Sequence, residues 1–184
     1  MTPRIPLVGP EGLDGDQKRV FDAIAGSRGH VVGPFLGLLH SPELADRVQN
    51  LGAFLRYRTR LGPRLSELAI LVTSRAFSCQ FEWFAHEKHA REAGLPDAVI
   101  EAVRVGRRPD PMVPDEAAVH DYAQELIEKR AVSDETHARA TAAFGIPGVV
   151  ELTALVGYYT LLAMTLNAHR IGPPGGEAPL PVAP

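Results

Sequence analysis

The sequence predicts an all-α protein, and three observations support that prediction. Apolar residues recur at helical spacing along most of the chain, and no alternation of polar and apolar residues is long enough to indicate a strand. Glycine and proline stand between these stretches, where they end one helix and open the next. The 184 residues are 45% hydrophobic and 22% charged, which suits one globular domain with a sizeable core. We therefore expect a single domain over residues 1–184, with flexible termini at 1–12 and 172–184, the second of which is rich in Pro and Gly.

Four helices are predicted in the N-terminal half of the chain. The clearest start is Ser41-Pro42, a capping serine followed by proline in the first turn. The clearest break is Gly62-Pro63, which ends that helix and opens the next. The four predicted helices span residues 13–27, 33–40, 42–58 and 63–76.

Five further helices are predicted after a break near residues 77–79. Ser78 is the predicted N-cap of the first of them, and Gly94 is its predicted stop. Ser133 is predicted to cap a helix that stops at Gly145. The predicted spans are residues 80–93, 96–105, 115–130, 134–144 and 148–167. Since short helices at this spacing merge or divide easily, we expect a bundle of about eight helices.

Residues 149–168 are apolar enough to resemble a membrane span. About 20 apolar residues are the length that a bilayer crossing needs. A helix apolar on all sides is also what the centre of a bundle or an oligomer interface requires. No second span or basic flank accompanies the segment, so we expect a core or interface helix and no membrane partner.

Composition excludes several classes of protein. The net charge is −3 and the arginines are scattered, so we expect no nucleic-acid partner. The chain has one cysteine and therefore no internal disulfide. The N-terminal residues have no apolar core of signal-peptide length, so we expect a cytoplasmic location.

The most informative local pattern is the spacing of Cys79, Glu82 and His86. These residues are separated by three and then four positions, which on a helix places all of them within roughly 60° of one another. A thiol, a carboxylate and an imidazole on one face are typical of a thiol-based or proton-transfer site. The competing interpretation is a buried small Cys79 beside an ordinary surface pair of Glu82 and His86.

The run from Glu67 through Cys79, Glu82 and His86 to Gly94 resembles the core motif of the carboxymuconolactone decarboxylase family, which includes the alkyl hydroperoxidase D proteins. In its peroxidase branch a glutamate, a Cys-x-x-Cys pair and a histidine occur at this spacing. Cys79 matches the first cysteine, and Glu82 stands where the second is expected. Residues 33–44 and 155–167 resemble the branch in which Glu-Trp follows the cysteine, so that the resemblance covers roughly residues 30–170.

The resemblance implies a fold, an assembly and a set of catalytic residues. The fold would be an alkyl hydroperoxidase D-like bundle, and the assembly a homo-oligomer, either a trimer or a hexamer built from dimers. Glu67, Cys79, Glu82 and His86 would form the catalytic site, with Glu67 accepting a proton directly or through His86. A position at a helix start lowers the pKa of a thiol, whereas two nearby carboxylates oppose the thiolate and raise the pKa of one carboxyl group.

The missing second cysteine decides which activity we expect. A two-cysteine peroxidase needs a resolving thiol to close a disulfide, and Glu82 cannot supply one. The decarboxylase relatives imply cofactor-independent decarboxylation, or a related proton transfer, on a small lactone, keto or carboxylic acid substrate. Such chemistry needs a proton donor and a cationic or hydrogen-bonding grip on the substrate.

Four further residues are candidates for contact with a small-molecule substrate. Arg75 is a candidate carboxylate clamp, although arginine on a helix is usually solvated. His89 shares the general face of His86; a metal pair is the alternative, but zinc sites usually show clearer ligand sets, so we expect no metal and no cofactor. Trp83 and Tyr158 either line a pocket or pack in the core.

Three functions from different classes therefore stay open. The first is the proton-transfer enzyme, which an intact relay beside an unreactive thiol would favour. The second is a one-cysteine hydroperoxide reductase, an antioxidant that uses Cys79 and an external thiol, which a low thiol pKa would favour. The third is a non-catalytic binding or scaffold protein, which a filled site would favour. The spacing fixes neither the substrate nor the distance from Glu67 to Cys79.

Overall fold

A computed structural model describes residues 2–181 and confirms the all-α class. Within that range the chain forms eight α-helices and one short 3₁₀ turn, with no strand. Their bounds lie within one or two residues of most predicted ones, and the elements are α1 (Gly15–Arg28), α2 (Pro34–Leu38), α3 (Pro42–Tyr57), α4 (Gly62–Ala76), α5 (Gln80–Glu92), α6 (Asp97–Arg104), α7 (Pro114–Lys129), α8 (Asp134–His169) and η1 (Pro174–Gly176).

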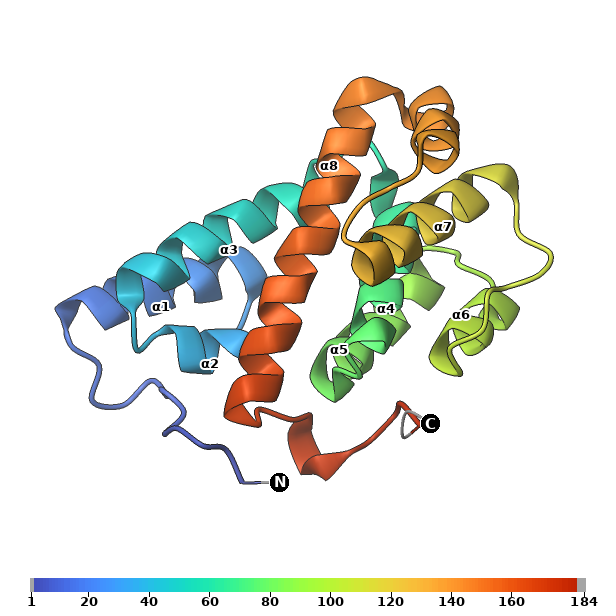
Figure 1. Cartoon of the computed structure of the whole chain (residues 1–184). Helices are drawn as coiled ribbons and strands as arrows, with labels where there is room; N and C mark the ends of the chain where they lie inside the picture. Colours follow the sequence, from blue (N-terminus) through green and yellow to red (C-terminus); the bar gives the residue numbers. More distant parts are fainter. Residues whose placement is uncertain (1, 182–184) are drawn as a thin grey trace.

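Helices α4 and α8 organise the molecule. The long α8 runs through the middle, with α1, α2 and α3 on one side and α4 to α7 on the other (Figure 1). Helix α4 packs against α3, α5, α6, α7 and α8. Every residue of α4 from 65 to 74 is buried, because this helix is surrounded on all sides. A side chain on this stretch of α4 is therefore buried whichever way it faces, whereas Arg64 and Arg75 near its two ends are partly exposed.

Helix α8 contains the break that the sequence predicts. Gly145 has φ 68° and ψ 170°, which no helical residue adopts, and Pro147 opens the helix again. By length and composition α8 could cross a membrane, with a mean hydropathy of 1.6 over its most apolar window. Half of that window is buried inside the bundle, as the core helix of a packed domain requires.

The junction between α4 and α5 corrects the predicted N-cap. The amide of Ser78 donates to Arg75 O (2.9 Å) and that of Cys79 donates to Ser74 O (2.8 Å), which together form a Schellman motif. Ser78 occupies the left-handed position of that motif, with φ 47°. Cys79, not Ser78, is the N-cap of α5, because the backbone of Ser78 is already used to close α4.

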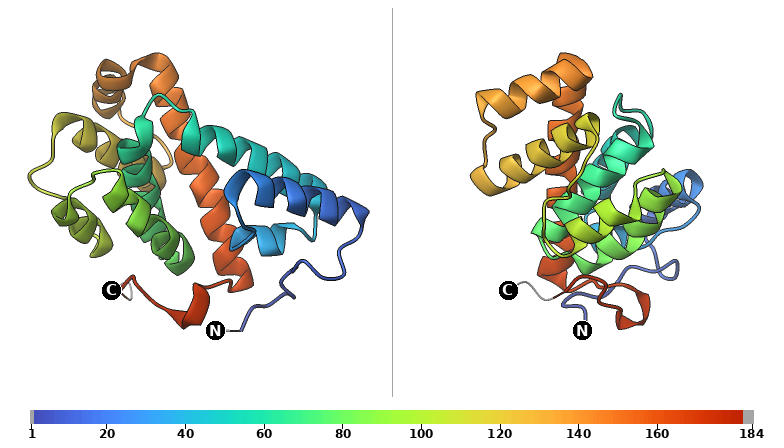
Figure 2. Two further views of the ribbon diagram at one scale, coloured as in Figure 1. Left: turned by 180° about the vertical axis from the view of Figure 1, so that it is seen from behind. Right: turned by 90° about the vertical axis from the view of Figure 1, so that its right-hand side faces the viewer.

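The described parts of both termini pack on the body of the chain. Near the N-terminus, the amide of Arg4 donates to His169 O at 2.9 Å. Near the C-terminus, Gln80 donates to and accepts from the backbone of Leu180, at 3.1 and 2.8 Å. Both segments lie at the end of the molecule where α8 finishes (Figure 2). The predicted flexibility of the termini stays a prediction, and residues 1 and 182–184 lie outside the described range.

Candidate active site

Two carboxylates and one imidazole form a buried line between α4 and α5. His86 Nδ1 lies 2.7 Å from Glu67 Oε2, and His86 Nε2 lies 3.5 Å from Glu82 Oε2. The three residues are 5%, 8% and 3% exposed, respectively. Both ring nitrogens of one histidine thus face a carboxyl group away from bulk water, which is a path along which protons can move.

The positions of these residues follow from the packing of three helices. Glu82 and His86 are one turn apart on α5, so their side chains share a face. Glu67 lies on α4, and the tight junction at Cys79 folds α5 back against that helix. Tyr159 of α8 closes the line, with its ring edge-on to His86 at a centroid distance of 5.1 Å. The structure thus brings Glu67, which the sequence alone could not place in space, next to His86.

Burial makes Glu82 the unusual acid of the cluster. It raises the pKa of the Glu82 carboxyl because a buried charge loses its hydration. The positive charges of His86 and Arg56 oppose this rise, and the negative charge of Glu67 adds to it. Glu82 therefore keeps its proton to a higher pH than an exposed glutamate does.

The Cys79 thiol differs from the sequence-based expectation. It is fully buried in a small apolar cluster with Phe81 and the side chains of Ala163, Leu166 and Ile171. Burial, with a contribution from the charge of Glu82, raises the pKa of Cys79 to about 12. Backbone N–H groups of Glu82 and Phe81 do favour the thiolate, as a helix start should, but burial outweighs them.

The four candidate substrate-binding residues are scattered. Trp83 is fully buried in the core, with no hydrogen-bond partner for its indole nitrogen among the described residues. His89 is exposed on α5, where it lies 3.3 Å from Glu92. Tyr158 is buried next to Tyr159, with ring centroids 5.3 Å apart. Of the four, Tyr158 is thus linked through Tyr159 to His86, and His89 lies at the outer edge of the cluster.

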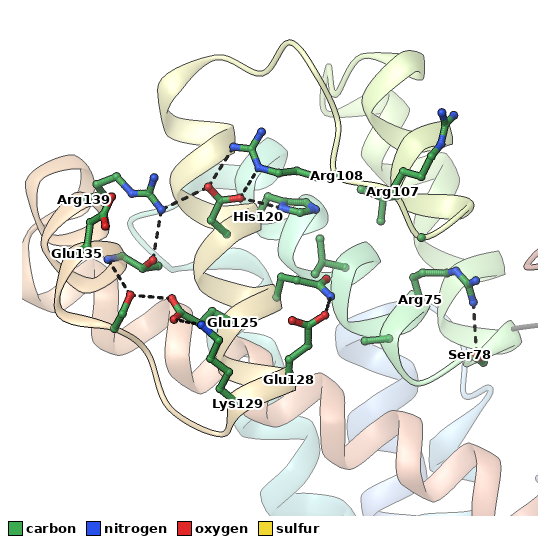
Figure 3. A pocket seen from close by; sticks show the side chains of 18 residues that line it. Arg75, Ser78, Arg107, Arg108, His120, Glu125, Glu128, Lys129, Glu135 and Arg139 are labelled. Atoms are coloured by element: carbon green, nitrogen blue, oxygen red, sulfur yellow. Dashed lines mark hydrogen bonds and ion pairs between the residues drawn. The ribbon is translucent and has the colours of Figure 1, made fainter. Parts of the chain in front are cut away.

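Arg75 lies in a different place, an open polar cleft of about 720 Å³. Its guanidinium rests against Gly106 and donates to Ser78 Oγ over 3.4 Å. Charged side chains from α4, α7, the start of α8 and the loop after α6 line the cleft (Figure 3). None of Glu67, Cys79, Glu82 and His86 lines it, so the structure does not bring Arg75 to the buried cluster.

Two arginines that the sequence analysis missed do approach the cluster. Arg28 at the end of α1 and Arg56 on α3 both act electrostatically on Glu82. Nothing in their local spacing marks them, because they belong to helices far upstream of the motif. The available signal was Gly52, since glycine inside a helix often marks a close approach by another group.

Across residues 2–181 no three His, Cys, Asp or Glu side chains are grouped with the geometry of metal ligands. The chemistry that the cluster itself offers is proton transfer between two carboxyl groups and an imidazole.

Comparison with known proteins defines the class first by its fold. The chain is similar to an uncharacterized peroxidase-related protein from Ralstonia eutropha JMP134, described as an alkylhydroperoxidase AhpD core (19% identity, TM-score 0.78, covering 94% of this chain and 93% of that one). It is also similar to a peroxidase-related protein from Silicibacter sp. TM1040 (14% identity, TM-score 0.77, covering 95% of each chain). These likenesses establish an alkyl hydroperoxidase D-like fold.

A third similar structure is the debrominase Bmp8, at 15% identity, a TM-score of 0.74, and coverage of 95% of this chain and 94% of that one. A cysteine-to-alanine variant of Bmp8 in complex with 2,3,4-tribromopyrrole is similar as well, at 15% identity and a TM-score of 0.71, covering 95% of this chain and 92% of that one.

The sequence comparison agrees with the fold. Residues 42–125 match the carboxymuconolactone decarboxylase family, and this match together with the fold confirms the resemblance to carboxymuconolactone decarboxylase-like and alkyl hydroperoxidase D-like proteins. No curated protein matches the sequence significantly.

Proposed function

We propose that this protein is an enzyme that decarboxylates, or transfers a proton on, a small lactone, keto or carboxylic acid compound without a cofactor. The observation that carries the proposal is the buried line of Glu67, His86 and Glu82, in which both ring nitrogens face a carboxyl group. Such a line can hold a proton near a reacting carbon and replace it after it is given away.

The roles follow from the electrostatics. Burial raises the pKa of Glu82, so Glu82 is the proton donor. When a carbon–carbon bond to the leaving carboxylate breaks, its electron pair stays on the substrate, and Glu82 gives that carbon a proton. His86 then returns a proton to Glu82 through Nε2, while Glu67 holds the ring through Nδ1. Glu67 therefore orients the imidazole and stabilises its charged form.

The state of the thiol favours this assignment over a peroxidase. With a pKa of about 12, Cys79 is almost entirely protonated at neutral pH, and a thiol is a poor nucleophile. In the proposed reaction Cys79 is a small apolar wall of the site, next to the donor Glu82.

Solvent-deuterium exchange tests the proposal. The probe is the lactone acid 5-oxotetrahydrofuran-2-carboxylate, and proton NMR follows deuterium incorporation beside its carbonyl group. We expect catalysed exchange that Glu82→Gln slows by about a hundredfold or more, since it removes the donor while keeping its shape. Cys79→Ala should change the rate by less than about threefold, and Asp121→Asn in the cleft is the matched control. A rate that depends on Cys79 and not on Glu82 would contradict the proposal.

A second candidate function, thiol-dependent reduction, is favoured by the two backbone N–H groups that face Cys79. The thiolate would attack one oxygen of a hydroperoxide, the O–O bond would break, an alcohol would leave, and an external thiol would reduce the sulfenic acid. That the debrominase Bmp8 was studied as a cysteine variant with a bound bromopyrrole also draws attention to the thiol.

Mass spectrometry of Cys79 during hydroperoxide treatment across pH separates the two candidates. Fast sulfenic acid formation, slowed in Glu67→Gln and His86→Ala, would establish the thiol reaction. Slow formation that neither variant changes would leave proton transfer as the function. An unreactive thiol together with no catalysed exchange would indicate a binding or scaffold protein.

We also propose that the chain assembles with copies of itself. An exposed apolar stripe lies along one face of α8, formed by Ile146, Val150, Leu161 and Met164, of which Ile146 is 71% exposed. Large exposed apolar patches usually mark interfaces. Light scattering of the wild type and of Val150→Asp tests this: the variant should have a smaller mass, and a monomeric wild type would contradict the proposal.

A further inference from the structure

Three buried polar atoms near the catalytic cluster have no hydrogen bond of ordinary geometry to a described residue: Arg28 Nε, Arg56 Nε and the hydroxyl oxygen of Tyr158. The Arg28 guanidinium does approach the Tyr158 hydroxyl, closely enough to oppose the rise in its pKa that burial causes. Buried donors are nearly always paired, and leaving one unpaired costs about 1–3 kcal/mol. Three such atoms from three different helices therefore call for a common explanation.

The three groups converge around Gly52 on α3. A Cβ atom on Gly52 would collide with the Tyr158 hydroxyl and lie 3.0 Å from Arg28 Nη2. Arg56 follows Gly52 by one helical turn and so lies on the same face of α3. Only a residue without a side chain lets the Tyr158 hydroxyl and the Arg28 guanidinium come this close to α3, which is a physical reason for glycine inside a helix.

The place where they converge adjoins the proton-transfer cluster. The ring of Tyr158 packs on that of Tyr159 at 5.3 Å, and Tyr159 packs on His86 at 5.1 Å. The charges of both arginines act on Glu82, and that of Arg56 also acts on Tyr159. A ligand held by the arginines would thus extend toward the donor Glu82.

Neither arginine lies within ion-pair distance of a carboxylate in residues 2–181, although the charges of Glu67 and Glu82 act on Arg56 from further away. The Arg28 guanidinium donates to the backbone oxygen of Gln49 at 3.2 Å. By contrast, Arg108 and Arg139 both pair with Asp121. Two half-buried guanidinium groups without counter-ions attract an anion.

We propose that Arg28, Arg56 and Tyr158 form a binding site for one carboxylate of the ligand whose other end reaches Glu82 and His86. This inference rests on the proposed function, which identifies the end of the ligand that reacts. A guanidinium group donates two parallel hydrogen bonds to a carboxylate, and the tyrosine hydroxyl supplies a third donor. A ligand with a single negative charge suits the site. The carboxyl groups of Glu67 and Glu82 lie on the side away from the arginines and would repel a second negative charge on the ligand.

Calorimetric titration with 5-oxotetrahydrofuran-2-carboxylate and with its neutral methyl ester tests this site. We expect the acid to bind the wild type at least tenfold more tightly than the ester. Arg28→Gln and Arg56→Gln should each weaken binding of the acid by about tenfold or more and leave binding of the ester unchanged. Arg58→Gln, at an exposed arginine that is the C-cap of α3, removes the same charge and should leave both affinities within twofold.

Tyr158→Phe keeps the ring and removes only the unpaired hydroxyl, so it separates binding from folding. We expect it to melt close to the wild-type temperature and to bind the acid about threefold or more weakly. Equal binding of the acid to the wild type, Arg28→Gln and Arg56→Gln, or loss of affinity in Arg58→Gln alone, would overturn the site.

The proposed binding site and the proposed reaction can be rejected independently of each other. Normal arginine-dependent binding with exchange that Glu82→Gln does not slow would keep the carboxylate site and reject the proposed reaction. Exchange that depends on Glu82 with binding that ignores both arginines would do the reverse.

Discussion

The buried cluster and the open cleft lie on different faces of the same helix and differ in almost every physical property. The cleft is large, about 720 Å³, and its charges are matched in exposed pairs such as Arg108 with Asp121 at 2.8 Å. The cluster is small, and its charges are buried and strongly coupled through His86. Water screens the first kind of pair and not the second. The comparison teaches that the largest hollow described and the most deeply buried ionisable groups lie in different parts of the molecule.

Removing one ionisable side chain from each region should give the largest difference in the free energy of unfolding between the two regions. His86→Ala leaves two carboxyl groups buried without their shared partner and should lower the free energy of unfolding by about 3 kcal/mol. Arg108→Ala breaks a pair whose arginine is half exposed and should cost less than about 1 kcal/mol. Urea denaturation of both variants measures the difference. Equal losses would mean that the cluster is solvated and the contrast is false.

Filling the space beside the cluster should come next in size. Gly52→Ala places a methyl group against the Tyr158 hydroxyl and should destabilise the protein by about 1–3 kcal/mol through overpacking. Gly26→Ala, on an exposed face of α1 with nothing within 4 Å, is the control and should gain about 0.5–1 kcal/mol. Thermal unfolding of the two variants checks the opposite signs. A stabilised Gly52→Ala would show that no group fills that space.

The two regions should also respond to pH with opposite slopes. Burial raises the pKa of Glu82 in the folded chain, so the folded state binds more protons than the unfolded state, and this residue makes stability fall as pH rises above the ordinary glutamate range. In the cleft, hydrogen bonds from Lys129 and Thr136 lower the pKa of Glu125 to about 2, so its contribution is present above the ordinary range and is lost as pH falls toward 2.

Denaturation of Glu82→Gln and Glu125→Gln between pH 3 and pH 8 tests these signs. Relative to the wild type, Glu82→Gln should become more stable as pH rises. Glu125→Gln should become less stable relative to the wild type as pH rises through the acidic part of the range, because only the wild type gains the contribution of the ionised Glu125 there. Parallel curves for the wild type and Glu82→Gln would show that Glu82 titrates as an exposed glutamate does.

The smallest expected effect lies at the boundary between the regions. Ser78 lines the cleft, precedes Cys79 and has φ 47°, a conformation that glycine adopts without strain. Ser78→Gly should stabilise the protein by up to about 1 kcal/mol, measured by thermal unfolding. A loss instead would mean that the Ser78 hydroxyl, near Arg75, matters more than the backbone strain.

The helices were predictable because the residues that begin and end them lie within a few positions of each boundary. Gly62 and Gly94 each stand at a helix boundary with positive φ, and Gly145 marks the break in α8, so these three glycines lie where the sequence predicts a helix to begin, end or break. Ser78 was misplaced because a serine after a helix and a serine before one look alike in sequence. Only the left-handed backbone distinguishes them, and that follows from how α5 folds back on α4.

The buried cluster was predictable in part, where its residues share a helix. Glu82 and His86 are one turn apart on α5, whereas Glu67 was linked to them only by the family motif and could not be placed in space from the sequence. Arg75 is close to Cys79 in sequence, but its position on α4 turns it toward the cleft. Arg28 and Arg56 reach the cluster only through the packing of α1 and α3. The pKa of Cys79 is set by residues of α8 nearly 90 positions away, which no local pattern encodes.

The contact between Gln80 and Leu180 has a practical consequence for protein engineering. One glutamine, directly after the cysteine, holds both the amide and the carbonyl of Leu180. The backbone of Leu180 is therefore tied to the first turn of the thiol-bearing helix. A tag or fluorescent domain fused close to Leu180 would compete with these two hydrogen bonds, so a cleavable tag with a long linker is the safer choice for any measurement on Cys79.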